Sequence, residues 1–207
     1  DKYHGGNVSL GSCLFGFGLI HDREGNDIYD GKINTQGAGA FGLGVLLDNQ
    51  GNDVYTCYSQ AQGFGFTKGV GLLWDKKGND NYITSSYGTD MIRYDNHSIS
   101  FSQGAGLGYR PLASGGIGLL IDGSGRDTYI SDIFGQGTGY WFSYGLLFDA
   151  SGDDTYQSFQ YSQGAGVHLA HGILWDKQGN DRYQSNGVSQ GCGECKCDIP
   201  LFRCAGG

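Results

Sequence analysis

The stretch DNQGNDVY, at residues 48–55, decides the fold because nearly the same eight residues occur six times in the chain. The other copies occupy residues 22–29, 75–82, 122–129, 149–156 and 176–183. Counted between their second aspartates, successive copies lie 26, 27, 47, 27 and 27 residues apart. A fixed period of about 20–50 residues marks a protein in which each repeat packs against the next. The chain is therefore predicted to form one repeat domain.

A second motif, QGxG, keeps the same period. Wherever nothing is inserted, its glutamine lies seven residues after the tyrosine of the first motif. Two insertions interrupt the register, one of fourteen residues between Tyr82 and Gln103 and one of six between Gly106 and Ile117. Extra residues are tolerated at surface bends and not within paired strands, so these sites and the DxxG bend predict three bends per repeat. The glutamines, which we expect to join successive repeats through their amides, are Gln36, Gln62, Gln103, Gln136, Gln163 and Gln190.

Three bends leave about nine residues a side, enough for a strand of five or six residues at roughly 3.3 Å per residue. The sequence therefore predicts an all-β fold, a parallel β-solenoid with three-sided rungs of about 27 residues. We expect the solenoid to span residues 1–191, with an insertion at about 83–102, and a Cys-rich cap or segment to follow at residues 192–207. Since DxxG is also a hairpin signature, the alternative is an antiparallel meander. The run GxGLLxDxxGNDxY resembles the hairpin repeat of membrane-occupation-and-recognition-nexus (MORN) proteins, but lacks its usual YxG.

Apolar alternation predicts two buried faces for the strand before each motif. Trp175, Ile173 and His171 lie on a bulky face, whereas Leu174 and Gly172 lie on a nearly bare one. A bare face lets another backbone approach closely. The bare face therefore explains why the chain has 40 glycines, and the glycine motifs need not be read as a phosphate-binding loop.

Net charge and the length of apolar runs limit the kinds of partner that the chain can bind. The formal charge of −8 disfavours nucleic acid and anionic membranes and suits cations. No apolar run approaches the roughly 20 residues that span a bilayer, so we expect no membrane insertion. The chain begins within the motif, because DKY at residues 1–3 matches the DxY of residues 53–55. We therefore expect it to be a mature or excised piece.

Two columns of carboxylates are the candidate metal ligands. In a solenoid, equivalent residues stack about 4.8 Å apart, and carboxylates at that spacing repel each other. Either each aspartate accepts hydrogen bonds from its own bend, or the columns bind a cation with oxygen ligands such as Ca²⁺. The columns are Asp22, Asp48, Asp75, Asp122, Asp149 and Asp176, and Asp27, Asp53, Asp80, Asp127, Asp154 and Asp181.

The phrase GNDxY resembles part of the calcium-binding nonapeptide repeat of RTX proteins, GGxGxDxUx. The resemblance covers only the six short phrases, and the motif comes once per 27 residues instead of every nine. It implies Ca²⁺ ligation by the second column. The array is also similar to tandem QGxG…LLxDxxGNDxY repeats of uncharacterised bacterial proteins, which implies no activity.

Six cysteines suggest an oxidising compartment and thus an extracellular or cell-surface location. We expect disulfides to staple the C-terminal segment. The alternative is Zn²⁺, for which the C-x-C spacing is cramped. The cysteines are Cys13, Cys57, Cys192, Cys195, Cys197 and Cys204.

The sequence favours a non-catalytic, extracellular structural or adhesive protein that associates end to end through unpaired edge strands and is stiffened by Ca²⁺. The alternative is a carbohydrate-binding or polysaccharide-processing β-helix, with surface glycans bound by a stripe of Gln and Tyr or near the insertion. An enzyme is disfavoured, since HExxH does not occur and the GxSxG match at residues 187–191 lies within the repeated QG motif. The insertion alone carries mixed chemistry, namely Asp90, Arg93, Tyr94, Asp95 and His97.

Overall fold

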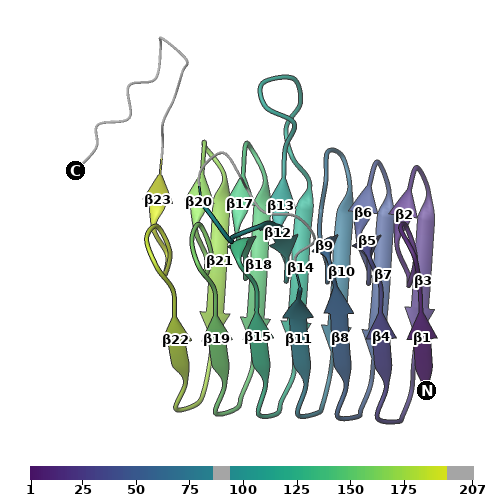
Figure 1. The fold of residues 1–207 in the computed structure, drawn as a ribbon. Helices are drawn as coiled ribbons and strands as arrows, with labels where there is room; N and C mark the ends of the chain where they lie inside the picture. Colours follow the sequence, from purple (N-terminus) through teal and green to yellow (C-terminus); the bar gives the residue numbers. More distant parts are fainter. Residues whose placement is uncertain (86–93, 195–207) are drawn as a thin grey trace.

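The computed structural model describes residues 1–85 and 94–194 and contains strands but no helix in these ranges. The strands of successive rungs stack in parallel, forming a β-solenoid of about seven rungs (Figure 1). The predicted solenoid is confirmed. The antiparallel meander is wrong, because equivalent residues of neighbouring rungs pair side by side, as Tyr29 does with Tyr55. Among the described residues, no helix is long and apolar enough to cross a bilayer.

The longest strand of each rung precedes the DxxG bend. Six such strands form one sheet, here called the long sheet, in which Leu46, Leu73 and Leu120 are paired neighbours. The strands are β3 (Phe17–His21), β7 (Leu43–Asp48), β10 (Val70–Asp75), β14 (Ile117–Asp122), β18 (Tyr144–Asp149) and β21 (His171–Asp176).

The strand after the bend carries the repeated tyrosine, and seven of these strands form the tyrosine sheet. The rings of Tyr29, Tyr55 and Tyr82 stack with centroids 4.8 and 4.9 Å apart and planes within 5°. The strands are β1 (Lys2–His4), β4 (Ile28–Asp30), β8 (Val54–Cys57), β11 (Asn81–Thr84), β15 (Thr128–Ile130), β19 (Thr155–Gln157) and β22 (Arg182–Gln184).

Shorter strands complete each rung on either side of the QG motif. One column comprises β5 (Ile33–Thr35), β9 (Ser59–Ala61), β12 (Ile99–Ser102) and β16 (Ile133–Gly135). The other comprises β2 (Cys13–Leu14), β6 (Gly39–Ala40), β13 (Gly106–Leu107), β17 (Gly139–Tyr140), β20 (Gly166–Val167) and β23 (Gly193–Glu194). A complete rung thus has up to four strands of unequal length instead of three equal sides, and the repeat pattern continues to Glu194.

The reason for the extra corner is the backbone of the QG motif. Gln36 and Gly37 both have positive φ, 54° and 72°, and the same pair of angles recurs in the other rungs. Two consecutive left-handed residues turn the chain sharply. A side chain at Gly37 would also place its Cβ 2.1 Å from the Leu72 carbonyl oxygen. Glycine is therefore required here for both conformation and space.

The core lies between the long sheet and the tyrosine sheet, where leucine and tyrosine columns are fully buried. The glycine side of the long sheet faces inward, and the Gly44 Cα lies against the Ala38 carbonyl. The bulky side faces outward, and Tyr144, Ile173 and Trp175 are exposed. The expectation that both faces are buried is therefore wrong for the bulky face.

Both insertions emerge at corners. Residues 86–93 of the first lie outside the described residues, and the chain re-enters the solenoid in β12. The second projects between β13 and β14 as a loop whose Tyr109 and Ala113 pair in antiparallel fashion (Figure 1).

Candidate functional sites: the acidic corner and the lateral groove

The DxxGxD bend joins the long sheet to the tyrosine sheet and brings both aspartate columns to one edge of the core, here called the acidic corner. Each first-column aspartate ends a strand of the long sheet with its side chain inward, except Asp22, which directly follows β3. One oxygen of Asp75 accepts a 2.7 Å bond from the Tyr55 hydroxyl, and the other accepts the Lys77 amide at 3.1 Å. Asp48, Asp122 and Asp149 repeat this arrangement. The expected capping of the aspartate's own bend is therefore present in the first column.

The second column is bonded differently. Asp53 Oδ1 accepts the backbone N–H of Asp27 at 2.6 Å, and the same bond links Asp53, Asp80, Asp127, Asp154 and Asp181 in turn. These aspartates therefore join neighbouring rungs and do not cap their own bends. Their second oxygens, Oδ2 of Asp27, Asp53, Asp80, Asp127 and Asp154, are buried and have no hydrogen-bond partner among the described residues.

Three carboxylates meet between each pair of rungs, with oxygens within 4.8 Å of one another. Among the described residues, the cation paired with these carboxylates is the N-terminal amine, which contacts Asp27. The clusters are Asp27, Asp48 and Asp53; Asp53, Asp75 and Asp80; Asp80, Asp122 and Asp127; and Asp127, Asp149 and Asp154.

Burial acts strongly on these acids. Desolvation, with repulsion from neighbouring carboxylates, raises the pKa of Asp53 and Asp154 to about 7, of Asp80 to about 9 and of Asp127 to about 10. Desolvation also raises the pKa of Asp75 to about 6, against the lowering effect of the Tyr55 hydrogen bond. At neutral pH the row must therefore be neutralised by protons or by cations.

The clusters fit a hard cation in donor chemistry and spacing. Their ligands are oxygens only, and these lie within 4.8 Å of one another, close enough for all three to approach one ion at a Ca²⁺–oxygen distance of roughly 2.3–2.6 Å. The unpartnered oxygens belong to the second column, whose residues the RTX resemblance implied as ligands. Asp53, Asp75 and Asp80 together would hold one such ion, and equivalent sets would hold the others.

The glutamine column has a structural role. Gln36 Nε2 donates to the carbonyls of Tyr29 in its own rung, at 2.8 Å, and of Thr56 in the next, at 2.7 Å. The amides thus join rungs through backbone carbonyls. Gln36, Gln62, Gln103, Gln136 and Gln163 are almost completely buried, as are the stacked Tyr29, Tyr55, Tyr82, Tyr129 and Tyr156, so these residues do not form a glycan-binding stripe. In the last rung, Gln190 and Tyr183 are exposed.

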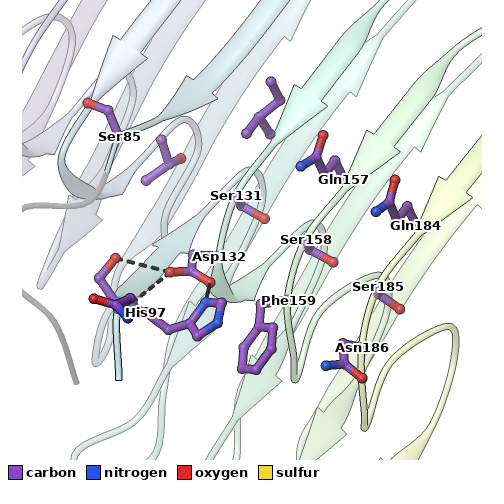
Figure 2. Close-up of a pocket in the computed structure, with 14 residues that line it drawn as sticks. Ser85, His97, Ser131, Asp132, Gln157, Ser158, Phe159, Gln184, Ser185 and Asn186 are labelled. Atoms are coloured by element: carbon purple, nitrogen blue, oxygen red, sulfur yellow. Dashed lines mark hydrogen bonds and ion pairs between the residues drawn. The ribbon is translucent and has the colours of Figure 1, made fainter. Parts of the chain in front are cut away.

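A second site is the groove beside the tyrosine sheet, next to the first insertion, here called the lateral groove (Figure 2). It encloses about 760 Å³ and is lined by hydroxyl and amide side chains from four stacked rungs. His97 Nδ1 lies 2.8 Å from Asp132 Oδ1, and Asp132 Oδ2 accepts the Ser98 amide at 2.6 Å. The His97 ring stacks on Phe159. The remaining lining residues are Thr84, Ser85, Asn96, Ile130, Ser131, Gln157, Ser158, Gln184, Ser185 and Asn186.

Of the insertion residues predicted to carry mixed chemistry, His97 lies in this groove and Tyr94 packs edge-on against Phe159. Asp90 and Arg93 lie outside the described residues. The sequence did not identify Asp132 or Phe159, which are 35 and 62 residues after His97. Both residues lie three positions after a repeated tyrosine, as Ser85 does, so the period places all three in one column. This shared position could have identified them from the sequence.

The cysteines differ from the expected disulfides. Cys13 and Cys57 are buried free thiols in different strand columns, β2 and β8, and burial raises the pKa of Cys57 to about 12. Cys57 Sγ instead lies 3.6 Å from Thr84 Oγ1. Cys192 is an exposed free thiol. The partners expected for Cys192, namely Cys195, Cys197 and Cys204, lie outside the described residues, so the disulfide cap of these four cysteines stays a prediction.

Comparisons of the chain with models of protein families, with curated proteins and with solved structures find no match.

Proposed function

We propose that this chain is a non-catalytic structural or adhesive solenoid of the cell surface or extracellular space, stiffened by Ca²⁺ in its acidic corner. The observation that carries the proposal is the row of buried, unpartnered Oδ2 atoms, which repeats over five rungs. The residues common to the rungs otherwise serve cohesion, through stacked Tyr rings, Gln amides and Asp-to-backbone bonds. A chain whose repeated residues join its rungs is suited to a mechanical role.

The proposed extracellular location suits the kind of calcium site proposed here. Each set has three carboxylates as ligands, fewer than the six to eight oxygens that a tight site supplies. Sites of extracellular modules bind Ca²⁺ with dissociation constants of about 10⁻⁴–10⁻³ M, whereas cytosolic buffers bind at about 10⁻⁹–10⁻⁸ M. Sets of this composition would be filled at millimolar Ca²⁺.

End-to-end association is the mode of assembly that we propose. Strands β1 and β22 are the outermost strands of the tyrosine sheet among the described residues, so each has one edge that no described strand pairs with. Such edges template pairing with another chain. A rung of a second copy has the period and the Asp, Tyr and Gln columns to continue the stack.

The test is thermal unfolding of the whole chain in EDTA and in millimolar Ca²⁺, with Mg²⁺ as the matched control. Since a ligand of the folded state alone raises stability by RT ln(1 + [L]/Kd), about 1.4 kcal/mol per site at ten times its dissociation constant, we expect several such sites together to give a clear rise in melting temperature with Ca²⁺. Electron microscopy of the same samples should reveal filaments. An unchanged melting temperature would reject the calcium role, and compact monomers at high concentration would reject end-to-end assembly.

The lateral groove favours a second candidate, glycan binding. Hydroxyl and amide side chains hydrogen-bond sugar hydroxyls, and an aromatic ring beside them offers an apolar face. Gln157, Gln184 and Phe159 supply these groups in the groove. Calorimetric titration with neutral and acidic oligosaccharides tests this. Binding that Gln157→Ala weakens would support the candidate, whereas no binding to either class would reject it.

A further inference from the structure

The outward side of the long sheet is the strongest unassigned surface of the molecule. Alternate residues of its six strands point away from the core, three from each strand. Exposed fractions reach 66% for Phe17, 54% for Tyr144 and 58% for Trp175. The eighteen residues define the outer apolar face: Phe17, Leu19, His21, Leu43, Val45, Leu47, Val70, Leu72, Trp74, Ile117, Leu119, Ile121, Tyr144, Leu146, Phe148, His171, Ile173 and Trp175.

This face has an unusual chemistry for a surface. None of its eighteen residues is Asp, Glu, Lys or Arg, and the two histidines are its most polar side chains. Parallel sheets are generally covered on both sides. The described elements that pack against the long sheet are the tyrosine sheet and the short strands β2, β6, β13, β17 and β20, and both lie on its inward side. The outer side is therefore the uncovered side of a parallel sheet.

Its flat area approaches the size of a standard interface. Six strands about 4.8 Å apart and about six residues long, at roughly 3.3 Å each, give a flat area of about 500 Å² before side-chain relief. Exposed residues at the adjoining corner, Phe15, Phe41, Phe142 and Leu169, extend it. A contiguous apolar surface above a few hundred Å² marks an interaction site, and a standard interface covers about 600–1,000 Å² per partner.

The absence of charge on this face selects its partner. An anionic membrane, a nucleic acid or an acidic polysaccharide would find too little positive charge here, since the cation recorded over the face is Lys76, whose ammonium lies 5.4 Å from the centre of the Trp74 ring. An apolar, flat partner can bury it, because two sheets pack face to face about 10 Å apart with interdigitating side chains. A second copy of this chain presents such a surface, and equal faces form a closed twofold contact. We propose that two copies pair laterally through their outer apolar faces.

This pairing is distinct from the end-to-end association proposed above, because it uses side chains of the long sheet and leaves the edge strands unpaired. It closes at two copies, whereas end-to-end pairing continues. The two modes therefore give different species in solution, a discrete dimer and a concentration-dependent polymer.

The experiment measures the mass of the whole chain by sedimentation, from micromolar to millimolar concentration, in wild type and two matched variants. Ile117→Lys places a charge in the outer apolar face, where Ile117 is 40% exposed. Ile28→Lys places the same charge on the outside of the tyrosine sheet, where Ile28 is 36% exposed. Circular dichroism and the melting temperature check that both variants fold.

We expect the smallest associated species of the wild type and of Ile28→Lys to sediment at twice 22.2 kDa, with end-to-end growth adding further dimers, and Ile117→Lys to form this dimer at least tenfold more weakly. Trp74 and Trp175 lie in the face, so dilution of the wild type should shift their fluorescence to the red, whereas Ile117→Lys should start from the red-shifted value. A wild type that stays monomeric at millimolar concentration overturns the proposal, as does an Ile117→Lys variant that dimerises like the wild type. Calcium dependence and filament growth do not bear on either outcome.

Discussion

At the scale of single residues, the acidic corner gives two chemically identical side chains different environments. Asp75 has both oxygens bonded, one to a tyrosine hydroxyl and one to a backbone amide. Asp80 has one oxygen bonded to the Asp53 amide and the other buried without a partner. The two columns should therefore respond differently to removal of charge.

Asp127→Asn isolates the charge of a second-column residue. Its amide oxygen can still accept the Asp80 N–H, bonded at 2.7 Å to Asp127 Oδ1, while the cost of keeping this buried acid protonated, whose pKa is about 10, is removed. In EDTA at pH 8 we expect stability equal to or above wild type, and in Ca²⁺ a smaller rise in melting temperature. Asp127→Ala leaves that N–H unbonded and should lower stability by about 1–3 kcal/mol in both media. If the asparagine variant keeps the full calcium response, Asp127 is not a ligand.

Tyr129→Phe tests the bond between the tyrosine and aspartate columns. The ring stack between Tyr82 and Tyr156 remains, but Asp149 loses the hydroxyl that donates at 2.7 Å. We expect a loss of about 1–3 kcal/mol in urea unfolding, because a buried acceptor is left unmet. The control is Tyr109→Phe, at an exposed tyrosine, which should change stability by less than about 0.5 kcal/mol. Equal effects of the two changes would argue against this bond.

At the scale of the element, the QG corner determines how a rung is folded. It inserts two left-handed residues between two short strands, and its glutamine amide donates to two rungs. The strand positions, the period and the location of both insertions can be predicted from the sequence. The fourth strand of the rung cannot be predicted, because nothing in a Gln-Gly pair indicates that the glutamine also has positive φ, as Gln136 does at 56°.

Gly137→Ala should disrupt this corner. Gly137 has a φ of 73°, and an added Cβ would lie 2.0 Å from the Ile173 carbonyl oxygen. The left-handed backbone alone costs an alanine about 1–2 kcal/mol, and the clash adds to it. Gly193→Ala is the matched control, because nothing lies within 4 Å of its Cβ position. Urea unfolding should separate the two variants by more than about 2 kcal/mol, and a smaller difference would contradict the corner's geometry.

At the scale of the whole molecule, the buried acids make stability depend on pH. In the metal-free folded chain, the pKa values of Asp53, Asp80, Asp127 and Asp154 lie well above the ordinary 3.8. The folded state therefore holds protons that the unfolded state releases near pH 4. Since stability falls with rising pH wherever the folded state binds more protons, this contribution is complete below about pH 4 and is lost as pH rises through about 7 to 10.

Urea unfolding in EDTA at pH 5, 7 and 9 should accordingly give decreasing free energies of unfolding. Millimolar Ca²⁺ should restore stability most at pH 9, where the carboxylates are ionised. A metal-free chain that becomes more stable from pH 5 to pH 9 would contradict the raised pKa values.

The sequence predicted the columns because residues one period apart occupy equivalent positions in neighbouring rungs. Asp53 must therefore lie beside Asp80. It could not predict which way the long strand faces. Alternation distinguishes Trp175 from Leu174 but does not say which of them is inside. It also could not pair His97 with Asp132, because an insertion has no period and its contacts depend on the path of a loop.

The parallel stacking of the strands also determines how the molecule responds to force. The backbone hydrogen bonds between rungs run along the solenoid axis, across the strands (Figure 1). Tension along the axis loads all the bonds between two rungs at once, whereas tension on the chain's end breaks them one after another. Each rung peeled in this way releases about 90 Å of extended chain, at roughly 3.3–3.6 Å per residue. The molecule therefore resists stretching along its length and yields in rung-sized steps when it is unravelled from one end.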